Sequence, residues 1–261
     1  MSAQPTLIFD FDSTLVRIET LEALADLALK DHPDAADIRD QVARLTDQAM
    51  AGEVPFGEAL RRRLALLPLT REHVIELAGR ILDEGTPSVR RNLRFFQENA
   101  GRILILSGGF REIIAPIAER LGLSPDQVFC NDLTYDAEGR VTGVDDANPL
   151  SQADGKPRVI KALNLSGPVV MIGDGWTDAE VKLAGAADRF YAYTEVVRRE
   201  RVVAVADAET PSMDDLLFAE GLAGRWSYPR RRIRMLLLEN IHPAAVERLT
   251  DEGYSVETIK G

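Results

Sequence analysis

Two acidic residues follow the first short apolar run of the chain. Residues 6–9 form that run, and Asp10 and Asp12 come directly after it. On an extended backbone, side chains two residues apart point to the same side. Paired carboxylates can bind a divalent cation, or one can attack an electrophile while the other moves a proton. An Asx-type turn or a helix cap is the alternative interpretation of this pair taken alone.

A second candidate segment has the chemistry of a phosphate site. Ser107, Gly108 and Gly109 follow the apolar run 102–106, and we expect them to open a helix. A small hydroxyl, a closely approached backbone and a helix N-terminus suit a phosphate oxygen. A plain strand-to-helix turn is the alternative.

A lysine is the third candidate. Lys156 follows Gly155 at the start of a predicted helix, and it is one of only five lysines in the chain. It can act as a point-charge phosphate ligand, although no P-loop pattern precedes it. A solvated lysine is the alternative.

Two more acids flank a glycine-rich turn. Asp174 and Asp178 lie in the segment Gly-Asp-Gly-Trp-Thr-Asp, which follows the apolar run 169–172. A Rossmann dinucleotide loop is excluded because the third glycine of its pattern is absent. A polar loop with a helix cap at Asp178 is the alternative.

The elements that must position these residues alternate between strands and helices. From residue 80 onward that alternation predicts an α/β fold with a parallel sheet, and such sheets place their sites at the carboxyl ends of the strands. The periodicity of residues 19–82 is helical. We therefore expect a core of residues 1–15 and 80–220, with residues 16–79 inserted after the first strand as a helical-bundle cap. Residues 135–144 are expected to form a hairpin.

The four segments, in this order, resemble the haloacid dehalogenase superfamily and, within it, the phosphoserine phosphatases. The resemblance runs over residues 6–217. It implies a Rossmann-like sheet with helices on both faces. It also implies that Asp10 attacks phosphorus and that Asp12 is the general acid and base.

The resemblance assigns further roles around that pair. Mg²⁺ is implied among Asp10, the main-chain carbonyl of Asp12 and Asp174, with Asp178 supporting the site from behind. The phosphate ligands implied are Ser107, Gly108, Gly109 and Lys156. The cap would select the substrate, with Glu19 holding an ammonium group and Arg63 a carboxylate. The remaining substrate contacts implied are Met50, Phe56 and Thr177.

Arg63 is also distinguished by its position in the helical pattern. In the run of arginines 61–63, only Arg63 falls on the apolar stripe formed by Phe56, Leu60, Leu64 and Leu67. Its alternative interpretation is a stem lying along an apolar face.

Composition excludes several other classes of protein. The chain has 261 residues and a net charge of −11, which argues against a nucleic-acid binder or a membrane-surface helix. No run approaches the roughly 20 apolar residues of a transmembrane helix. Cys130 is the single cysteine, so it has no partner for an internal disulfide. We expect a cytoplasmic enzyme acting on a small phosphate monoester.

The last part of the sequence has a different character. Residues 221–261 are expected to form a linker with five arginines between residues 225 and 234, and then a β-α-β unit. Residues 234–261 resemble the opening of D-3-phosphoglycerate dehydrogenases, which act earlier in serine biosynthesis. This resemblance implies a fusion or partner contact, or a homodimer, through the tail. An incidental extension is the alternative.

Three functions remain open from the sequence. The first is hydrolysis of O-phospho-L-serine, the last step of serine biosynthesis. The second is action on another small phosphate monoester, or transfer of the phosphoryl group to an acceptor such as homoserine. The third is a non-catalytic half of a serine-pathway fusion.

Overall fold

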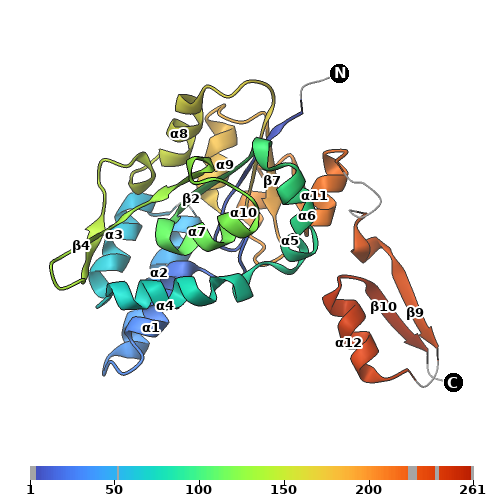
Figure 1. Cartoon of the computed structure of the whole chain (residues 1–261), viewed down its shortest axis with the longest axis horizontal. Coiled ribbons are helices and arrows are strands. Elements are labelled where there is room, and N and C mark those ends of the chain that lie inside the picture. Colours follow the sequence, from blue (N-terminus) through green and yellow to red (C-terminus); the bar gives the residue numbers. More distant parts are fainter. Residues whose placement is uncertain (1–3, 52, 223–227, 239–240, 260–261) are drawn as a thin grey trace.

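A six-stranded parallel sheet forms the centre of the protein. The structure is a computed structural model that describes residues 4–51, 53–222, 228–238 and 241–259 (Figure 1). The strands lie in the order β3-β2-β1-β6-β7-β8. Their bounds are β1 Thr6–Phe9, β2 Ile103–Phe110, β3 Val128–Asn131, β6 Val169–Gly173, β7 Arg189–Tyr193 and β8 Ala208–Thr210. The predicted α/β class and parallel sheet are confirmed.

Helices cover both faces of this sheet because its central strands are apolar on both sides. In β1, Leu7 and Phe9 belong to one buried cluster, whereas Ile8 belongs to the other. The helices between residues 85 and 222 are α5 Pro87–Arg91, α6 Leu93–Glu98, α7 Arg111–Arg120, α8 Gly155–Leu163, α9 Trp176–Leu183, α10 Glu200–Val203 and α11 Met213–Ala219. Residues of α6, α7 and α11 join the first cluster, and residues of α8, α9 and α10 join the second.

Four helices between β1 and β2 form the layer above one end of the sheet. They are α1 Thr20–Ala28, α2 Ala35–Met50, α3 Phe56–Leu66 and α4 Arg71–Arg80. The predicted hairpin, β4 Leu133–Tyr135 with β5 Val141–Val144, is attached to this layer. The Arg71 amide donates to the Gly139 carbonyl at 2.9 Å, and the Val141 amide donates to the Leu69 carbonyl at 2.9 Å.

Two expectations about local structure are wrong. Ser107, Gly108 and Gly109 do not open a helix, because β2 continues through them to Phe110 and α7 begins at Arg111. The alternation of strands and helices after residue 80 also predicts one helix over residues 88–98, but the structure divides it at Asn92 into α5 and α6. The Asn92 side chain donates to the Ser88 carbonyl at 2.9 Å and to Asp214 at 2.7 Å, so the break carries a buried polar contact.

The tail forms a small lobe beside α5 and α11 (Figure 1). Strand β9 Arg234–Leu238 pairs in parallel with β10 Ser255–Ile259, and α12 Pro243–Asp251 joins them. Arg231 pairs with the buried carboxylate of Asp215 at 2.8 Å, and the Arg232 guanidinium lies over the Phe218 ring. Residues 223–227 of the expected linker, with Arg225, lie outside the described residues. Among the described residues, no helix is long and apolar enough to span a bilayer.

Short 3-10 helices complete the description. They are Ile81–Glu84, Ala100–Arg102, Pro125–Gln127, Pro149–Ser151 and Arg230–Arg232.

Candidate active site

The predicted site residues come together where the carboxyl ends of β1, β2 and β6 meet beneath the cap. Asp10 follows β1, Ser107 lies near the end of β2, and Asp174 follows β6. All three side chains are buried. The parallel register explains this convergence, because β1 lies between β2 and β6 in the sheet.

Asp10 is held by a buried lysine. The Lys156 amine lies 2.9 Å from Asp10 Oδ1 and 2.6 Å from Asp178 Oδ1. The Phe11 amide donates to the same Asp10 oxygen at 2.7 Å. Burial alone would lower the pKa of Lys156, but the two neighbouring carboxylates raise it above its usual value. The lysine therefore stays charged and fixes the direction of the Asp10 carboxylate.

Asp12 has the environment of a carboxylic acid that keeps its proton. Burial raises its pKa well above the usual value, and the nearby charges of Glu19 and Asp10 raise it further. Thr20 Oγ1 donates to Asp12 Oδ2 at 3.0 Å. The other oxygen, Oδ1, is buried without a hydrogen-bond partner, and Asp12 lines a cavity that also contains Asp10 and Lys156. A protonated Asp12 can therefore deliver a proton inside the site.

Three carboxylates lie close enough to share one cation. Oxygens of Asp10, Asp174 and Asp178 are within 4.8 Å of one another, and hard oxygen ligands suit Mg²⁺ or a similar ion. Asp178 is already engaged, since its oxygens take the Lys156 amine at 2.6 Å and the Gly175 amide at 3.0 Å. Burial, followed by repulsion from Asp10, raises the pKa of Asp178 to about 7 despite the opposing effect of Lys156. Asp178 thus orients Lys156, and Asp10 and Asp174 are the other two candidate metal ligands of this group.

The segment Ser107–Gly109 offers small donors beside Asp10. Ser107 Oγ accepts from the Gly109 amide at 2.9 Å. Asn131 donates to the Gly108 carbonyl at 2.9 Å and holds this part of β2 in place. A Cβ built on Gly108 would lie 2.2 Å from the Phe56 ring. Any larger residue here would force the Phe56 ring of the cap to move, so glycine lets that ring pack directly on the backbone.

The cap side of the site contains the acidic group of Glu19 and the basic group of Arg63. Glu19 Oε1 accepts from Ser13 Oγ at 2.8 Å. Arg63 is buried, donating to Thr46 Oγ1 at 2.9 Å and to the Ala59 carbonyl at 3.3 Å. Burial lowers the pKa of Arg63, while the charges of Glu19 and Asp12 raise it. Arg63, which lies on the apolar stripe of its helix, therefore places a charged group inside the site.

The enclosed space at this site is small. Its volume is about 30 Å³, and it is lined by residues of both layers, including Asp10, Asp12, Glu19, Phe56, Arg63, Ser107, Gly108, Gly109, Lys156 and Thr177. This volume holds only about two water molecules.

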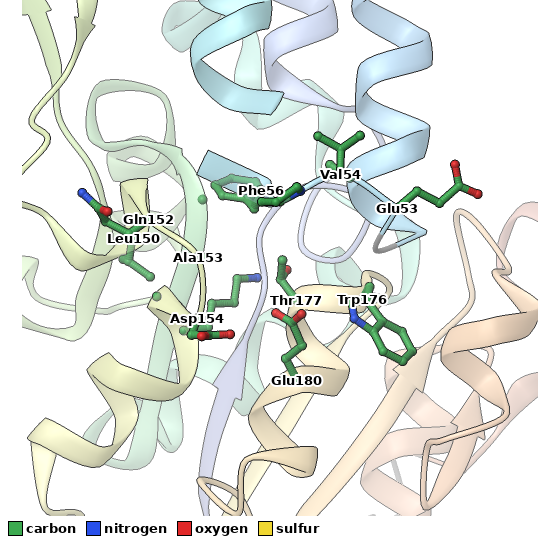
Figure 2. A pocket seen from close by; sticks show the side chains of 15 residues that line it. Glu53, Val54, Phe56, Leu150, Gln152, Ala153, Asp154, Trp176, Thr177 and Glu180 are labelled. Atoms are coloured by element: carbon green, nitrogen blue, oxygen red, sulfur yellow. The ribbon is translucent and has the colours of Figure 1, made fainter. Parts of the chain in front are cut away.

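A larger cavity of about 310 Å³ adjoins it. Figure 2 shows Phe56 of the cap facing Thr177 and Glu180 of α9, with Trp176 at the start of that helix. Phe56, Thr177 and Lys156 line both cavities. The side chain of Met50, the remaining expected substrate contact, lies outside the described residues.

Several polar residues at the site were not singled out from the sequence. Thr20 contacts Asp12, and Thr14 Oγ1 donates to Asp174 Oδ1 at 3.2 Å. Arg199 pairs with Asp174 and lies 3.5 Å from Glu19. Both threonines flank the acidic motif, a signal that sequence reasoning could have used. Nothing in the sequence distinguishes Arg199 from Arg198 and Arg201.

The chain is similar to known proteins over most of its length. A family model of haloacid dehalogenase-like hydrolases matches residues 7–181. Human phosphoserine phosphatase is 35% identical over 197 residues, covering 74% of this chain and 83% of the human protein.

Solved structures agree with that match. A substrate-bound phosphoserine phosphatase complex superposes with a TM-score of 0.68 at 26% identity, covering 84% of this chain and 99% of that one. A phospho-aspartyl intermediate analogue of phosphoserine phosphatase gives 0.66 at 26% identity, covering 83% and 99%. The chain therefore belongs to the haloacid dehalogenase-like hydrolases and, within them, to the phosphoserine phosphatase family.

Proposed function

We propose that this enzyme hydrolyses O-phospho-L-serine to L-serine and phosphate through an aspartyl-phosphate on Asp10. The observation that carries the proposal is the convergence of Asp10, Lys156 and Asp12 below one cap-side acid and one cap-side base. A phosphoserine phosphatase relative and a substrate complex of the same family support it.

The two carboxylates divide the chemistry. Asp10, oriented by Lys156 and the Phe11 amide, attacks phosphorus while the serine oxygen leaves. Asp12 enters the reaction protonated because its pKa is raised, and it gives its proton to that oxygen. It then takes a proton from water, which attacks the aspartyl-phosphate and releases phosphate while Asp10 is regenerated.

We propose Mg²⁺ as the metal, held by Asp10, Asp174 and the main-chain carbonyl of Asp12. When bound, the ion would neutralise charge on the phosphoryl oxygens. The donors proposed for the same oxygens are Ser107, the amides of Gly108 and Gly109, and Lys156. Thr177 lines the site beside Lys156 and would contribute a hydrogen bond on the substrate side.

Substrate choice is assigned to the cap side. Glu19 would accept the ammonium group of phosphoserine, Arg63 would bind its carboxylate, and Phe56 and Met50 would cover it. The domain division at residues 16–79 and a cytoplasmic location remain part of this proposal.

Phosphate release from a panel of monoesters tests the function. We expect phosphoserine to be preferred over aryl and sugar phosphates, and we expect Asp10→Asn to abolish release while the fold is retained. Homoserine added to the assay separates the alternatives, because phosphohomoserine formation in place of free phosphate would identify a phosphotransferase. No turnover of any monoester by the metal-loaded protein would favour a non-catalytic role.

A further inference from the structure

The proposed metal site contains an internal cation. Asp174 is buried, with 1% of its side chain exposed, and Arg199 pairs with its Oδ2 oxygen. The Thr14 hydroxyl donates a hydrogen bond to the other oxygen, Oδ1. Both oxygens of this carboxylate are therefore engaged, and an ion that binds Asp174 must compete with the Arg199 cation already paired with it.

The Arg199 guanidinium also lies near Glu19, the residue proposed to bind the substrate amine. A second nitrogen of Arg199 lies 3.5 Å from Glu19 Oε1. Arg199 thus connects the carboxylate expected to bind the metal with the carboxylate expected to bind the substrate amine. These two residues come from opposite sides of the site, since Glu19 precedes α1 of the cap and Asp174 follows β6 of the sheet.

The surroundings of Arg199 allow its side chain to move away from Asp174. Its side chain is 17% exposed, so the long flexible stem has a route to solvent. Its backbone is held, because the Arg199 carbonyl accepts from the Val202 and Val203 amides at 3.0 Å and α10 begins directly after this residue. The side chain can therefore swing away from a fixed anchor.

We propose that Arg199 is a counter-cation for Asp174 and Glu19 in the metal-free enzyme and that Mg²⁺ displaces it. The inference rests on the proposed metal site. Exchanging one cation for another keeps a buried carboxylate neutralised, so the site never holds Asp174 as an unpaired charge. Displacement also frees Glu19, which couples metal binding to recognition of the substrate amine, and the coupling is reciprocal.

Magnesium affinity is the direct test. Isothermal titration of metal-free Arg199→Met with Mg²⁺ alone should show binding about tenfold tighter than in wild type, since one charged hydrogen bond no longer competes. Arg199→Lys keeps the charge without the guanidinium fork, and it should fall between the two. It also serves as the measured variant if Arg199→Met does not fold.

The neighbouring arginine provides the matched control. Arg198 pairs with Glu209 at 2.9 Å and is 44% exposed, so Arg198→Met should bind Mg²⁺ as wild type does. The metal-free melting temperature of Arg199→Met should fall below that of Arg198→Met, and saturating Mg²⁺ should close the gap.

L-serine tests the coupling without a phosphate group that touches the metal. Mg²⁺ should tighten serine binding severalfold in wild type, measured by NMR titration, and should leave it unchanged in Arg199→Met. Equal or weaker Mg²⁺ binding by Arg199→Met relative to wild type would overturn this inference alone. Absence of Mg²⁺ binding by wild type would remove the proposed metal site, and the inference with it.

Discussion

At the scale of single residues, burial makes Asp12 a proton donor by raising the pKa of its carboxyl group. Its pKa is raised first by desolvation and then by Glu19 and Asp10. Between the usual pKa and the raised one, the folded chain holds a proton that the unfolded chain has released. The stability of the metal-free protein therefore decreases as the pH rises through this range.

Asp12→Asn should remove that dependence. The variant cannot ionise, so its metal-free form should be more stable than wild type near pH 8, and the difference should shrink toward about pH 4, where the ordinary carboxyl titrates. Thermal melts in EDTA across this range measure it. Turnover should fall roughly 100-fold or more because proton transfer is lost. A stability difference that does not vary with pH would contradict the raised pKa.

Glu19 and Arg63 should discriminate substrates without serving the phosphate. Glu19→Gln and Arg63→Met each remove a charged contact to phosphoserine, which costs on the order of 1.5–3 kcal/mol in kcat/KM. An aryl phosphate lacks the amine and the carboxylate, so its hydrolysis should change much less. Ratios of kcat/KM for the two substrates provide the measurement. Equal losses on both would instead assign these residues to folding or to the phosphate site.

The sequence analysis identified the site residues that directly follow strands. It missed the site residues that other segments of the chain bring to the site. Asp10 and Asp174 were predictable because short apolar runs precede them and parallel strands end at one edge. Arg199 was not, because its place depends on how the segment after β7 returns to the site, 25 positions beyond Asp174. No local pattern of hydrophobicity encodes that return.

At the scale of elements, α10 contacts the end of α2 beside the larger cavity. Arg201 of α10 donates to the Ala51 carbonyl at the end of α2, and its guanidinium lies 3.9 Å from the centre of the Trp176 ring. This arrangement gives Trp176 a role that its sequence position did not reveal. Through Arg201, Trp176 at the start of α9 is connected to the end of α2 in the cap, next to the larger cavity.

Arg201→Ala should loosen the cap. One exposed cation–π contact and one hydrogen bond are together worth about 1–2 kcal/mol, so opening should become roughly 5- to 30-fold more frequent. Hydrogen exchange of residues 49–56 should accelerate accordingly, while exchange in β1 and β6 should stay unchanged. Arg198→Ala is the matched control. Unaltered exchange over residues 49–56 would mean that other contacts hold the cap closed.

The boundaries of elements show a second limit of sequence patterns. The sequence pattern predicts that a helix opens at Ser107 and the glycines at residues 108 and 109, yet β2 continues through them. The reason is that β3 pairs with the extension at Phe110 and Asn131 donates to the Gly108 carbonyl. Tertiary pairing overrides local propensity there. The alternation of strands and helices was robust because it depends on long segments and not on single residues.

At the scale of the whole molecule, the tail is attached to the enzyme but stands apart from its site. Its contacts are with α11, through Arg231 and Asp215 and through Arg232 and Phe218. None of the residues that line the two site cavities comes from the described part of the tail. Its resemblance to a dehydrogenase opening, and any fusion or dimer contact made through it, stay predictions.

Ending the chain after Leu222 should therefore leave phosphoserine hydrolysis within a few-fold of the full-length value. The truncated chain loses the Arg231 partner of Asp215. The arginine of this pair is half exposed, so the pair is worth about 1 kcal/mol and the melting temperature should decrease only slightly. It also loses Leu236, Leu238 and Ile259, which are all more than half exposed on the two-stranded sheet. Such a strand pair invites association with another chain. Full-length protein should consequently show a higher apparent mass with increasing concentration in analytical ultracentrifugation, whereas the truncated protein should not. Loss of activity in a truncated chain with an unchanged circular dichroism spectrum would mean that the tail contributes to the active site.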